Sequence, residues 1–396
     1  MKILISAASF PSSISGLQRH GLNLARCLLE RPEISALHLV VSPWQADFLP
    51  AAGLVARDRL STHIAEMNHS SLSRNLWHYR RLPALAAALG ADLVHLTFPM
   101  PVHAARFCCP TVVTLHDMYP YEIPLNFGFP KFIFNRVTLR QCLRNADAIA
   151  CVSEATSRRL RQYAPMIAWR KSIRIYNCVE PAPLCAIQSP IRGWQGQSFL
   201  LCVAQHRRNK NIPLMIAAFA RLLRSGRMDS GSMLVVVGIA GPESGHIRRF
   251  ISSRGLSRRI HLLEGLSDSE LAWCYKRCEA LVAPSITEGF GLPVAEALLA
   301  GGRVVCSDIP AFREVGGELC RYVTLDKNPE EALADAISAA LKEPKKPPVS
   351  LPQFSSPVLA GLYIGLYRGL MASYAASRNA GRSASMRAAS WEGHTL

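Results

Sequence analysis

Two glutamates, Glu288 and Glu296, stand eight positions apart, and the residues between them have the types that bind an anion. Gly289 and Gly291 let a ligand come close to the backbone, and Pro293 suits the first turn of a helix, where an N–H group would lack a partner anyway. Free N–H groups and the positive end of a helix dipole favour a phosphate there. Carboxylates on both sides suit a molecule with hydroxyl groups at its ends and phosphates in the middle, such as a nucleotide sugar. On spacing alone, a helix cap and a surface residue explain the pair equally well.

The elements around this stretch predict how it is positioned. ALVAPS (280–285) has the composition of a buried strand, and VAEALLAGG predicts a helix that ends at the glycine pair Gly301 and Gly302. The loop between them therefore lies at the carboxyl end of a strand, which is where ligands bind in open parallel sheets.

Short apolar runs alternate with helical patterns along almost the whole chain, as is typical of parallel strands joined by helical crossovers. Strands are expected within 2–7, 37–42, 93–98, 111–117 and 147–153, and again within 198–205, 233–238, 260–265, 280–285 and 303–308. A proline-rich stretch separates the two series. The sequence therefore predicts an α/β protein with two tandem, doubly wound, Rossmann-like domains that face a cleft.

We expect the following division of the chain. Residues 1–180 form the N-terminal Rossmann-like domain, 181–197 the linker and 198–345 the C-terminal Rossmann-like domain. Residues 346–376 form a connector and a docked helix, and 377–396 form a disordered tail.

Composition limits the partners. The chain has 396 residues, of which 49% are hydrophobic and 18% charged, so it can bury a large core. Its formal charge of +17 favours anionic partners. It has no compact Lys/Arg tract, zinc-finger spacing or RNA-binding aromatic signature, so we expect no nucleic acid. Its 12 cysteines are scattered without C-x2-C pairs, which indicates reduced thiols in a cytoplasmic protein. No apolar run reaches the length of a membrane span, so we expect only peripheral contact with a membrane.

Two further groups of charged residues have competing interpretations. Asp268 and Glu270 might suggest a metal site, but Ser267 with Glu270 forms the pattern of a capping box. No D-x-D occurs, so we expect no metal. A series of basic residues lies close to three phenylalanines, and it is either a solvated face or a surface for anionic lipid. The series comprises Lys131, Arg136, Arg140 and Arg144, with Phe129, Phe132 and Phe134.

The stretch PSITEGFGLPVAEALLAGG (284–302) resembles the E-x7-E signature of family 4 retaining glycosyltransferases, which have two facing Rossmann-like domains in the GT-B architecture. This large family includes many bacterial mannosyl- and glucosyltransferases. Further segments resemble the family along nearly the whole chain: SGLQRHGLNLARCL (15–28), VTLHDMYPYE (113–122), DAIACVSEAT (147–156), IYNCVEP (175–181), VAQHRRNKNIPLMIAAF (203–219) and CSDIPAFREVGGE (306–318). Ala204, Gln205, Arg303 and Ser15 depart from its usual pattern.

The resemblance implies a role for each matching residue, with the donor in the C-terminal domain and the acceptor in the N-terminal one. Glu288 contacts the donor sugar, Glu296 binds the ribose hydroxyls, and His116 lies across the cleft near the reacting sugar. Backbone N–H groups hold the sugar hydroxyls and the diphosphate, and cations neutralise the leaving diphosphate. The N–H groups belong to Gly289, Phe290, Gly291 and Leu292, the cations are Lys210 and one of Arg207 or Arg208, and Gly16 lies near the diphosphate and the acceptor.

The resemblance also implies the reaction. We expect retaining, metal-independent transfer of a hexose, best mannose from GDP-mannose, to a lipid-linked or saccharide acceptor in bacterial exopolysaccharide or lipopolysaccharide biosynthesis. The protein would use no cofactor and work in the cytoplasm, at most peripherally on the inner face of the membrane. A UDP-hexose donor is the nearest alternative, followed by an epimerase or hydrolase, or a non-catalytic sugar- or lipid-binding protein. A nicotinamide-dependent enzyme is disfavoured, because no G-x-G-x-x-G follows the first strand.

Overall fold

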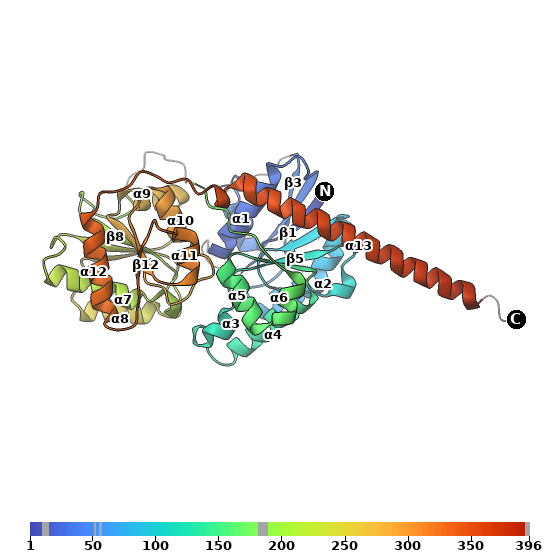
Figure 1. Ribbon diagram of the computed structural model, residues 1–396, viewed down its shortest axis with the longest axis horizontal. Helices are drawn as coiled ribbons and strands as arrows, with labels where there is room; N and C mark the ends of the chain where they lie inside the picture. Colours follow the sequence, from blue (N-terminus) through green and yellow to red (C-terminus); the bar gives the residue numbers. More distant parts are fainter. Residues whose placement is uncertain (10–15, 51–52, 55–57, 181–188, 393–396) are drawn as a thin grey trace.

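The computed structural model describes residues 1–9, 16–50, 53–54, 58–180 and 189–392. Ser15, the linker stretch 181–188 and the last residues 393–396 lie outside the described residues. Within the described residues the chain forms two parallel sheets, each covered by helices (Figure 1). The predicted fold class is confirmed.

The first domain contains a seven-stranded parallel sheet in the order β3-β2-β1-β4-β5-β6-β7. Its strands are β1 (Lys2–Ser6), β2 (Ala36–Val41), β3 (Leu60–Ile64), β4 (Leu93–Leu96), β5 (Thr111–Leu115), β6 (Ala148–Cys151) and β7 (Ser172–Arg174). Its helices are α1 (Gly16–Leu29), α2 (Ser71–Ala88), α3 (Tyr119–Glu122), α4 (Lys131–Asn145), α5 (Glu154–Tyr163) and α6 (Pro165–Lys171). The order reverses between β1 and β4, so the ligand crevice of this domain opens beyond their carboxyl ends.

The second domain repeats the plan with a six-stranded parallel sheet in the order β10-β9-β8-β11-β12-β13. Its strands are β8 (Phe199–Val203), β9 (Met233–Val237), β10 (Ile260–Leu263), β11 (Ala280–Ala283), β12 (Val304–Ser307) and β13 (Arg321–Val323). Its helices are α7 (Ile212–Arg224), α8 (Ser244–Ser253), α9 (Asp268–Arg277), α10 (Leu292–Leu299), α11 (Pro310–Gly316) and α12 (Pro329–Lys342). Here the order reverses between β8 and β11, and β11 leads directly into the Glu288 stretch.

Short 3-10 helical segments connect several of these elements. They are η1 (Pro43–Phe48), η2 (Ala104–Arg106), η3 (Pro124–Asn126), η4 (Arg208–Lys210) and η5 (Pro352–Phe354). Two of them, η3 and η4, contact each other where the domains meet, because Asn126 Nδ2 donates a hydrogen bond to Asn209 Oδ1 at 3.0 Å.

The last helix, α13 (Ser356–Glu392), follows the second domain in sequence but lies along the first (Figure 1). Leu359, Tyr363, Ile364 and Tyr367 are buried in the first domain's core together with residues of α1. The predicted docked helix is therefore present and completes the first domain. No helix in the described part of the chain is long and apolar enough to cross a membrane.

The helix also corrects one prediction. We expected disorder from residue 377, but α13 continues to Glu392. The physical reason is composition, because residues 377–392 are rich in alanine and arginine, which favour helix, and contain no proline. The low apolar content of residues 377–392 was the reason for expecting disorder. It does not prevent the backbone from forming a helix.

Candidate functional site

The Glu288 loop, residues 284–291, joins β11 to α10 at the carboxyl end of the second sheet. Gly291 precedes α10 with φ +110°, and Pro293 lies in the first turn of the helix, as predicted. A Cβ at Gly291 would lie 2.8 Å from the Phe312 ring, so only glycine fits at this position. At the other end of the helix Gly301 has φ +76°, which confirms the predicted stop.

Glu288 lies at the centre of a set of polar contacts. Its Oε1 accepts a hydrogen bond from Lys210 Nζ at 2.5 Å and another from Ser285 Oγ at 2.8 Å. The Tyr119 hydroxyl lies 3.3 Å from the other oxygen, Oε2. The side chains of Glu288 and Lys210 are only 11% and 20% exposed. Lys210 and Ser285 belong to the second domain and Tyr119 to the first, so the carboxylate lies where the two domains meet.

The basic residues after β8 differ in their environments. Lys210 ends the short η4 turn and reaches Glu288, while Arg208 points to solvent. Arg207 is half-buried, donates from Nε to Gln205 Oε1 at 2.7 Å, and lies 6.0 Å from the centre of the Phe127 ring of the first domain. Of the two candidate arginines, Arg207 is therefore the one that faces the other domain.

His116 and Asp117 follow β5 on the opposite side of the cleft. Burial lowers the pKa of His116 to about 4, so the ring is neutral at pH 7. Its Nε2 lies 2.8 Å from the Thr97 carbonyl, which can only accept, so Nε2 carries the proton and Nδ1 can accept a hydrogen bond. Burial raises the pKa of Asp117 to about 6, and its Oδ1 accepts the Tyr119 N–H at 3.0 Å.

The two domains approach each other closely at two predicted glycines. A Cβ at Gly289 would lie 1.8 Å from the His116 carbonyl oxygen, so the Glu288 loop packs directly on the backbone after β5. A Cβ at Gly16 would lie 3.7 Å from Leu292 Cδ1. The structure therefore brings Gly16, His116 and the Glu288 loop together across the cleft.

Glu296 lies one turn inside α10, where its Oε2 accepts from the Tyr275 hydroxyl at 2.6 Å. Next to it, Arg19 of α1 reaches across the cleft to Asp268, with Nη1 and Oδ1 2.6 Å apart. The charges of Glu296 and Asp268 both raise the pKa of Arg19, although burial opposes them. The predicted capping box of Ser267 and Glu270 is present at the start of α9.

Several of these partners were not identified from the sequence. Tyr119 lies three residues after His116 and Asn209 directly before Lys210, so each was inside a matching motif without being singled out. Asn209 Nδ2 donates to the Tyr119 hydroxyl at 3.2 Å. Arg19 also lies inside a matching segment, 15–28, but its contact with Asp268 depends on how the two domains face each other. Tyr275 had no comparable signal, because it lies outside the matching segments.

A small cavity of about 10 Å³, with room for about one water molecule, lies beside Lys210, Ser285 and Glu288. A larger cavity of about 430 Å³ is lined by Arg303, Arg321 and Lys346, among others, and contains none of the predicted site residues. Its arginines already have partners, since Arg303 contacts Glu279 and Arg321 contacts Glu343. We therefore assign the chemistry to the interdomain site in spite of its smaller cavity.

Some residues of the basic and aromatic series around α4 are partly buried, and others are exposed. Arg136 is half-buried and donates from Nε to the Pro120 carbonyl at 2.7 Å, with its guanidinium 5.2 Å from the centre of the Phe132 ring. The outer surface instead presents exposed apolar and basic side chains together. We call this set the α4 surface: Phe129, Lys131, Ile133, Phe134, Val137, Arg140 and Arg144.

Two known protein families match this chain, one in each domain. The family described as "Glycosyltransferase Family 4" matches residues 14–182. The family described as "Glycosyl transferases group 1" matches residues 188–349.

Individual proteins are similar to this chain over most of its length. The chain is 26% identical over 361 residues to O-antigen chain mannosyltransferase B of Escherichia coli, covering 87% of this chain and 91% of that protein. It is 32% identical over 361 residues to GDP-mannose:cellobiosyl-diphosphopolyprenol alpha-mannosyltransferase of Xanthomonas oryzae pv. oryzae, covering 86% and 87%. The solved structure of Anabaena Alr3699/HepE with UDP-glucose has a TM-score of 0.62 at 18% identity, covering 95% of this chain and 100% of that one. At this identity the structural likeness shows the fold alone.

Proposed function

The chain belongs to the glycosyltransferases of group 1 and family 4 with the GT-B fold, and from this premise we propose that it transfers mannose from GDP-mannose with retention of configuration. The acceptor would be a lipid-linked or saccharide molecule in bacterial polysaccharide biosynthesis. The observation that carries the proposal is the contact between Lys210 and Glu288 at the start of α10, directly opposite His116.

Most of the predicted site residues would have a role in this reaction. Glu288 would accept hydrogen bonds from sugar hydroxyls, and Glu296 would bind the ribose. The backbone N–H groups of the Glu288 loop and the start of α10 would hold the diphosphate, since a helix start favours an anion. His116 would accept a hydrogen bond from a sugar hydroxyl through Nδ1, because its Nε2 proton is already donated to the Thr97 carbonyl.

In the proposed transfer, the bond between the anomeric carbon and the diphosphate oxygen breaks as the acceptor oxygen forms a bond to the same face of that carbon. The acceptor proton passes to the departing diphosphate. Lys210, with Arg207 as the better-placed of the two arginines, would stabilise the negative charge that develops on the leaving group. Closure of the cleft would exclude water and limit hydrolysis of the donor.

We propose that Lys210, Arg207 and the start of α10 stabilise the diphosphate without a metal ion. Among the described residues, no three His, Cys, Asp or Glu side chains are grouped so that they could hold one. Turnover that is unchanged by a chelator would support this part of the proposal, and turnover that depends on added Mg²⁺ or Mn²⁺ would contradict it.

The proposed donor is inferred from the relatives. GDP-mannose is favoured because the Xanthomonas relative, at 32% identity, carries that donor in its name. A UDP-hexose is the alternative, since the Anabaena neighbour was solved with UDP-glucose.

Calorimetric titration of GDP, UDP, ADP and dTDP in the absence of metal tests the donor site. We expect selective binding of GDP, with a loss of about tenfold or more in Glu296→Ala, because a hydrogen-bonded charged group is worth about 1.5–3 kcal/mol. Glu270→Ala, which removes a carboxylate from the α9 cap, is the matched control. Selective UDP binding would overturn the mannose assignment, and no binding of any nucleotide would revive a non-catalytic binding protein. Retention would then be checked from the anomeric configuration of the product by NMR.

We further propose that the α4 surface rests on the anionic inner face of the membrane, where a lipid-linked acceptor would be found. Phe129 is 81% exposed and Val137 is 62% exposed, and the exposed basic residues of the same surface would face lipid phosphates. The protein as a whole carries a formal charge of +17, which adds attraction to such a membrane.

Co-sedimentation with vesicles tests this surface. Wild type should bind vesicles that contain anionic phosphatidylglycerol more strongly than neutral phosphatidylcholine vesicles. Phe129→Ser with Val137→Ser should weaken that binding severalfold, since each lost apolar contact costs about 1 kcal/mol or more. Leu72→Ser, at a 70% exposed position on α2, is the control. Equal binding by the double variant and the control would contradict the proposal.

A further inference from the structure

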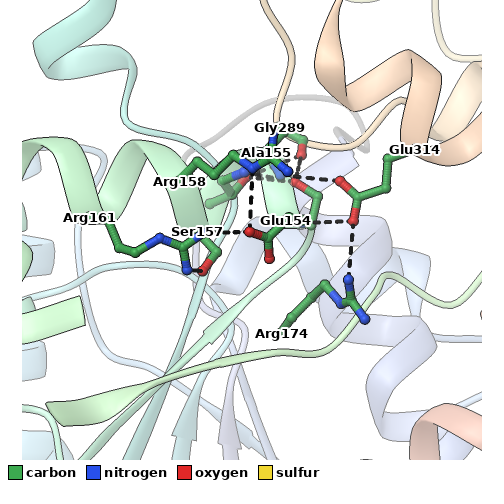
Figure 2. A network of polar contacts seen from close by, with 10 residues as sticks. Glu154, Ala155, Ser157, Arg158, Arg161, Arg174, Gly289 and Glu314 are labelled. Atoms are coloured by element: carbon green, nitrogen blue, oxygen red, sulfur yellow. Dashed lines mark hydrogen bonds and ion pairs between the residues drawn. The ribbon is translucent and has the colours of Figure 1, made fainter. Parts of the chain in front are cut away.

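The helix α5 begins at the cleft, and the second domain supplies partners for its first backbone N–H groups. The N–H groups of Glu154 and Ala155 donate to the two carboxylate oxygens of Glu314, at 2.7 and 3.1 Å. The N–H group of Thr156 donates to Ser153 Oγ at 2.9 Å. N–H groups in a first turn have no partner within their own helix, and the helix dipole favours negative charge there. A carboxylate of one domain therefore caps a helix of the other (Figure 2).

Two hydroxyl groups at the same helix start contact the Glu288 loop. Ser153 Oγ donates to the Gly289 carbonyl in a short hydrogen bond, and Thr156 Oγ1 lies 3.1 Å from the same oxygen. Thr156 Oγ1 also lies 3.0 Å from the His116 carbonyl. Ser153 can thus donate a hydrogen bond to the Gly289 carbonyl while Thr156 donates one to the His116 carbonyl. Each hydroxyl has one proton to donate, so both carbonyls have a partner.

These contacts fix the direction of one peptide group in the Glu288 loop. The Gly289 carbonyl points toward α5, and in a trans peptide the following N–H group, that of Phe290, points the opposite way. The Phe290 N–H is one of the groups assigned above to the donor. The hydrogen bonds to the Gly289 carbonyl therefore set the orientation of an N–H group that is assigned to the nucleotide sugar.

A second route connects α5 to the same loop through α11. Glu314 and Phe312 both lie on α11, and the Phe312 ring packs so closely on Gly291 that a Cβ there would lie 2.8 Å from it. Glu314 is also 4.0 Å from Arg174 Nη1 at the end of β7. The Glu314 side chain is only 14% exposed, so its contacts with α5 are shielded from water.

We propose that Ser153, Thr156 and Glu314 are positioning residues for the transfer reaction: they dock the start of α5 on the Glu288 loop and orient the Gly289–Phe290 peptide toward the donor. The inference rests on the proposed function and deepens it, because it makes closure of the two domains a condition for the active arrangement of the loop. Nucleotide binding also relies on Glu296, Lys210 and the start of α10, so we expect this contact to matter more for the transfer step than for nucleotide binding.

Kinetics of paired variants test the proposal. Thr156→Val removes the hydroxyl at constant shape and should lower kcat about tenfold, whereas Thr156→Ser keeps the hydroxyl and should retain kcat within about twofold. Glu314→Gln should lower kcat by a similar factor, and Glu318→Gln, at an exposed position just past α11, should leave it unchanged. The Kd of the nucleotide should stay within about threefold in every variant. Equal kcat for the Val and Ser variants, or a nucleotide Kd that weakens as much as kcat falls, would overturn the proposal.

Small-angle X-ray scattering gives a readout that is independent of activity. Without ligand, Glu314→Ala should have a larger radius of gyration than wild type and Glu318→Ala, because the carboxylate that joins the domains is lost. Thermal unfolding of the same samples shows whether each variant is folded. An unchanged radius of gyration in a folded Glu314→Ala would overturn the docking role. If wild type binds no nucleotide at all while the scattering difference is present, the proposed function fails and the docking role does not.

Discussion

At the scale of single residues, the cleft is organised around the contact between Lys210 and Glu288. The two groups lie 2.5 Å apart, and Ser285 and Tyr119 contact the same carboxylate. Breaking a shielded pair by removing one partner leaves the other charge without compensation. The pair therefore holds Glu288 in place, and in the reaction proposed above Lys210 would supply the positive charge that stabilises the leaving group.

Removal of the Lys210 charge should mainly affect the chemical step. We expect Lys210→Ala to lower kcat with saturating donor by about 100-fold, in the range seen when a group that stabilises developing charge is removed. Lys210→Arg should retain part of the activity, because the charge remains. Lys276→Ala, at an exposed position on α9, serves as the control. Unchanged kcat in Lys210→Ala would contradict the assigned role.

At the scale of elements, the sequence predicted the buried strands and the Glu288 loop well. Strands such as β5 and β9 are buried along their whole length, so their apolar runs were clear. Three strands were not predicted: β3 and β7, at the two edges of the first sheet, and β13, at one edge of the second. Edge strands are covered on fewer sides, and these contain polar residues such as His63, Arg174 and Arg321, which hide the strand pattern.

The same limit explains which parts of the site could be predicted. Glu288, Glu296 and Lys210 lie in local motifs, so the sequence alone was enough to single them out as candidates. Contacts between domains, such as Glu314 with the start of α5 or Arg19 with Asp268, join residues far apart in the chain. A local pattern carries no information about such pairs, because they depend on the packing of one complete domain against another.

The geometry of the Glu288 loop can be tested at Gly291. Gly291→Ala places a Cβ at φ +110°, 2.8 Å from the Phe312 ring, and should destabilise the protein by about 1–3 kcal/mol. Gly245→Ala in α8 is the control, because its φ is ordinary and its Cβ would lie 3.7 Å from the nearest atom, Arg249 Nη1. Chemical denaturation of both variants measures the difference. Equal stability of the two variants would show that the loop does not need glycine there.

At the scale of the whole molecule, buried titratable groups should make stability depend on pH. Burial lowers the pKa of His78 to about 4 and that of His95 to about 3, so the folded state keeps both rings neutral. Their contribution is present above the unfolded pKa of 6.5 and is lost as pH falls toward these folded values. Asp117 acts in the opposite direction, because its raised pKa makes its contribution greatest in acid and lost as pH rises through about 6.

The balance predicts a loss of stability on acidification. Between pH 7.5 and pH 5, His78, His95 and His116 should each cost about 2 kcal/mol of unfolding free energy, while Asp117 should offset about 1 kcal/mol. Urea unfolding at the two pH values measures the change. His78→Gln should reduce it by about 2 kcal/mol, and His246→Gln, at an exposed position, should leave it as in wild type. A pH dependence that is the same in both variants would contradict the prediction.

The path of α13 has a mechanical consequence. The chain crosses between the domains twice, once after β7 on its way to β8 and once between α12 and α13, where the helix returns to pack beside α1 in the first domain. Two connections restrict the relative movement of the domains more than a single connection would, so we expect Gly289 to return to its contact with α5 whenever the domains close.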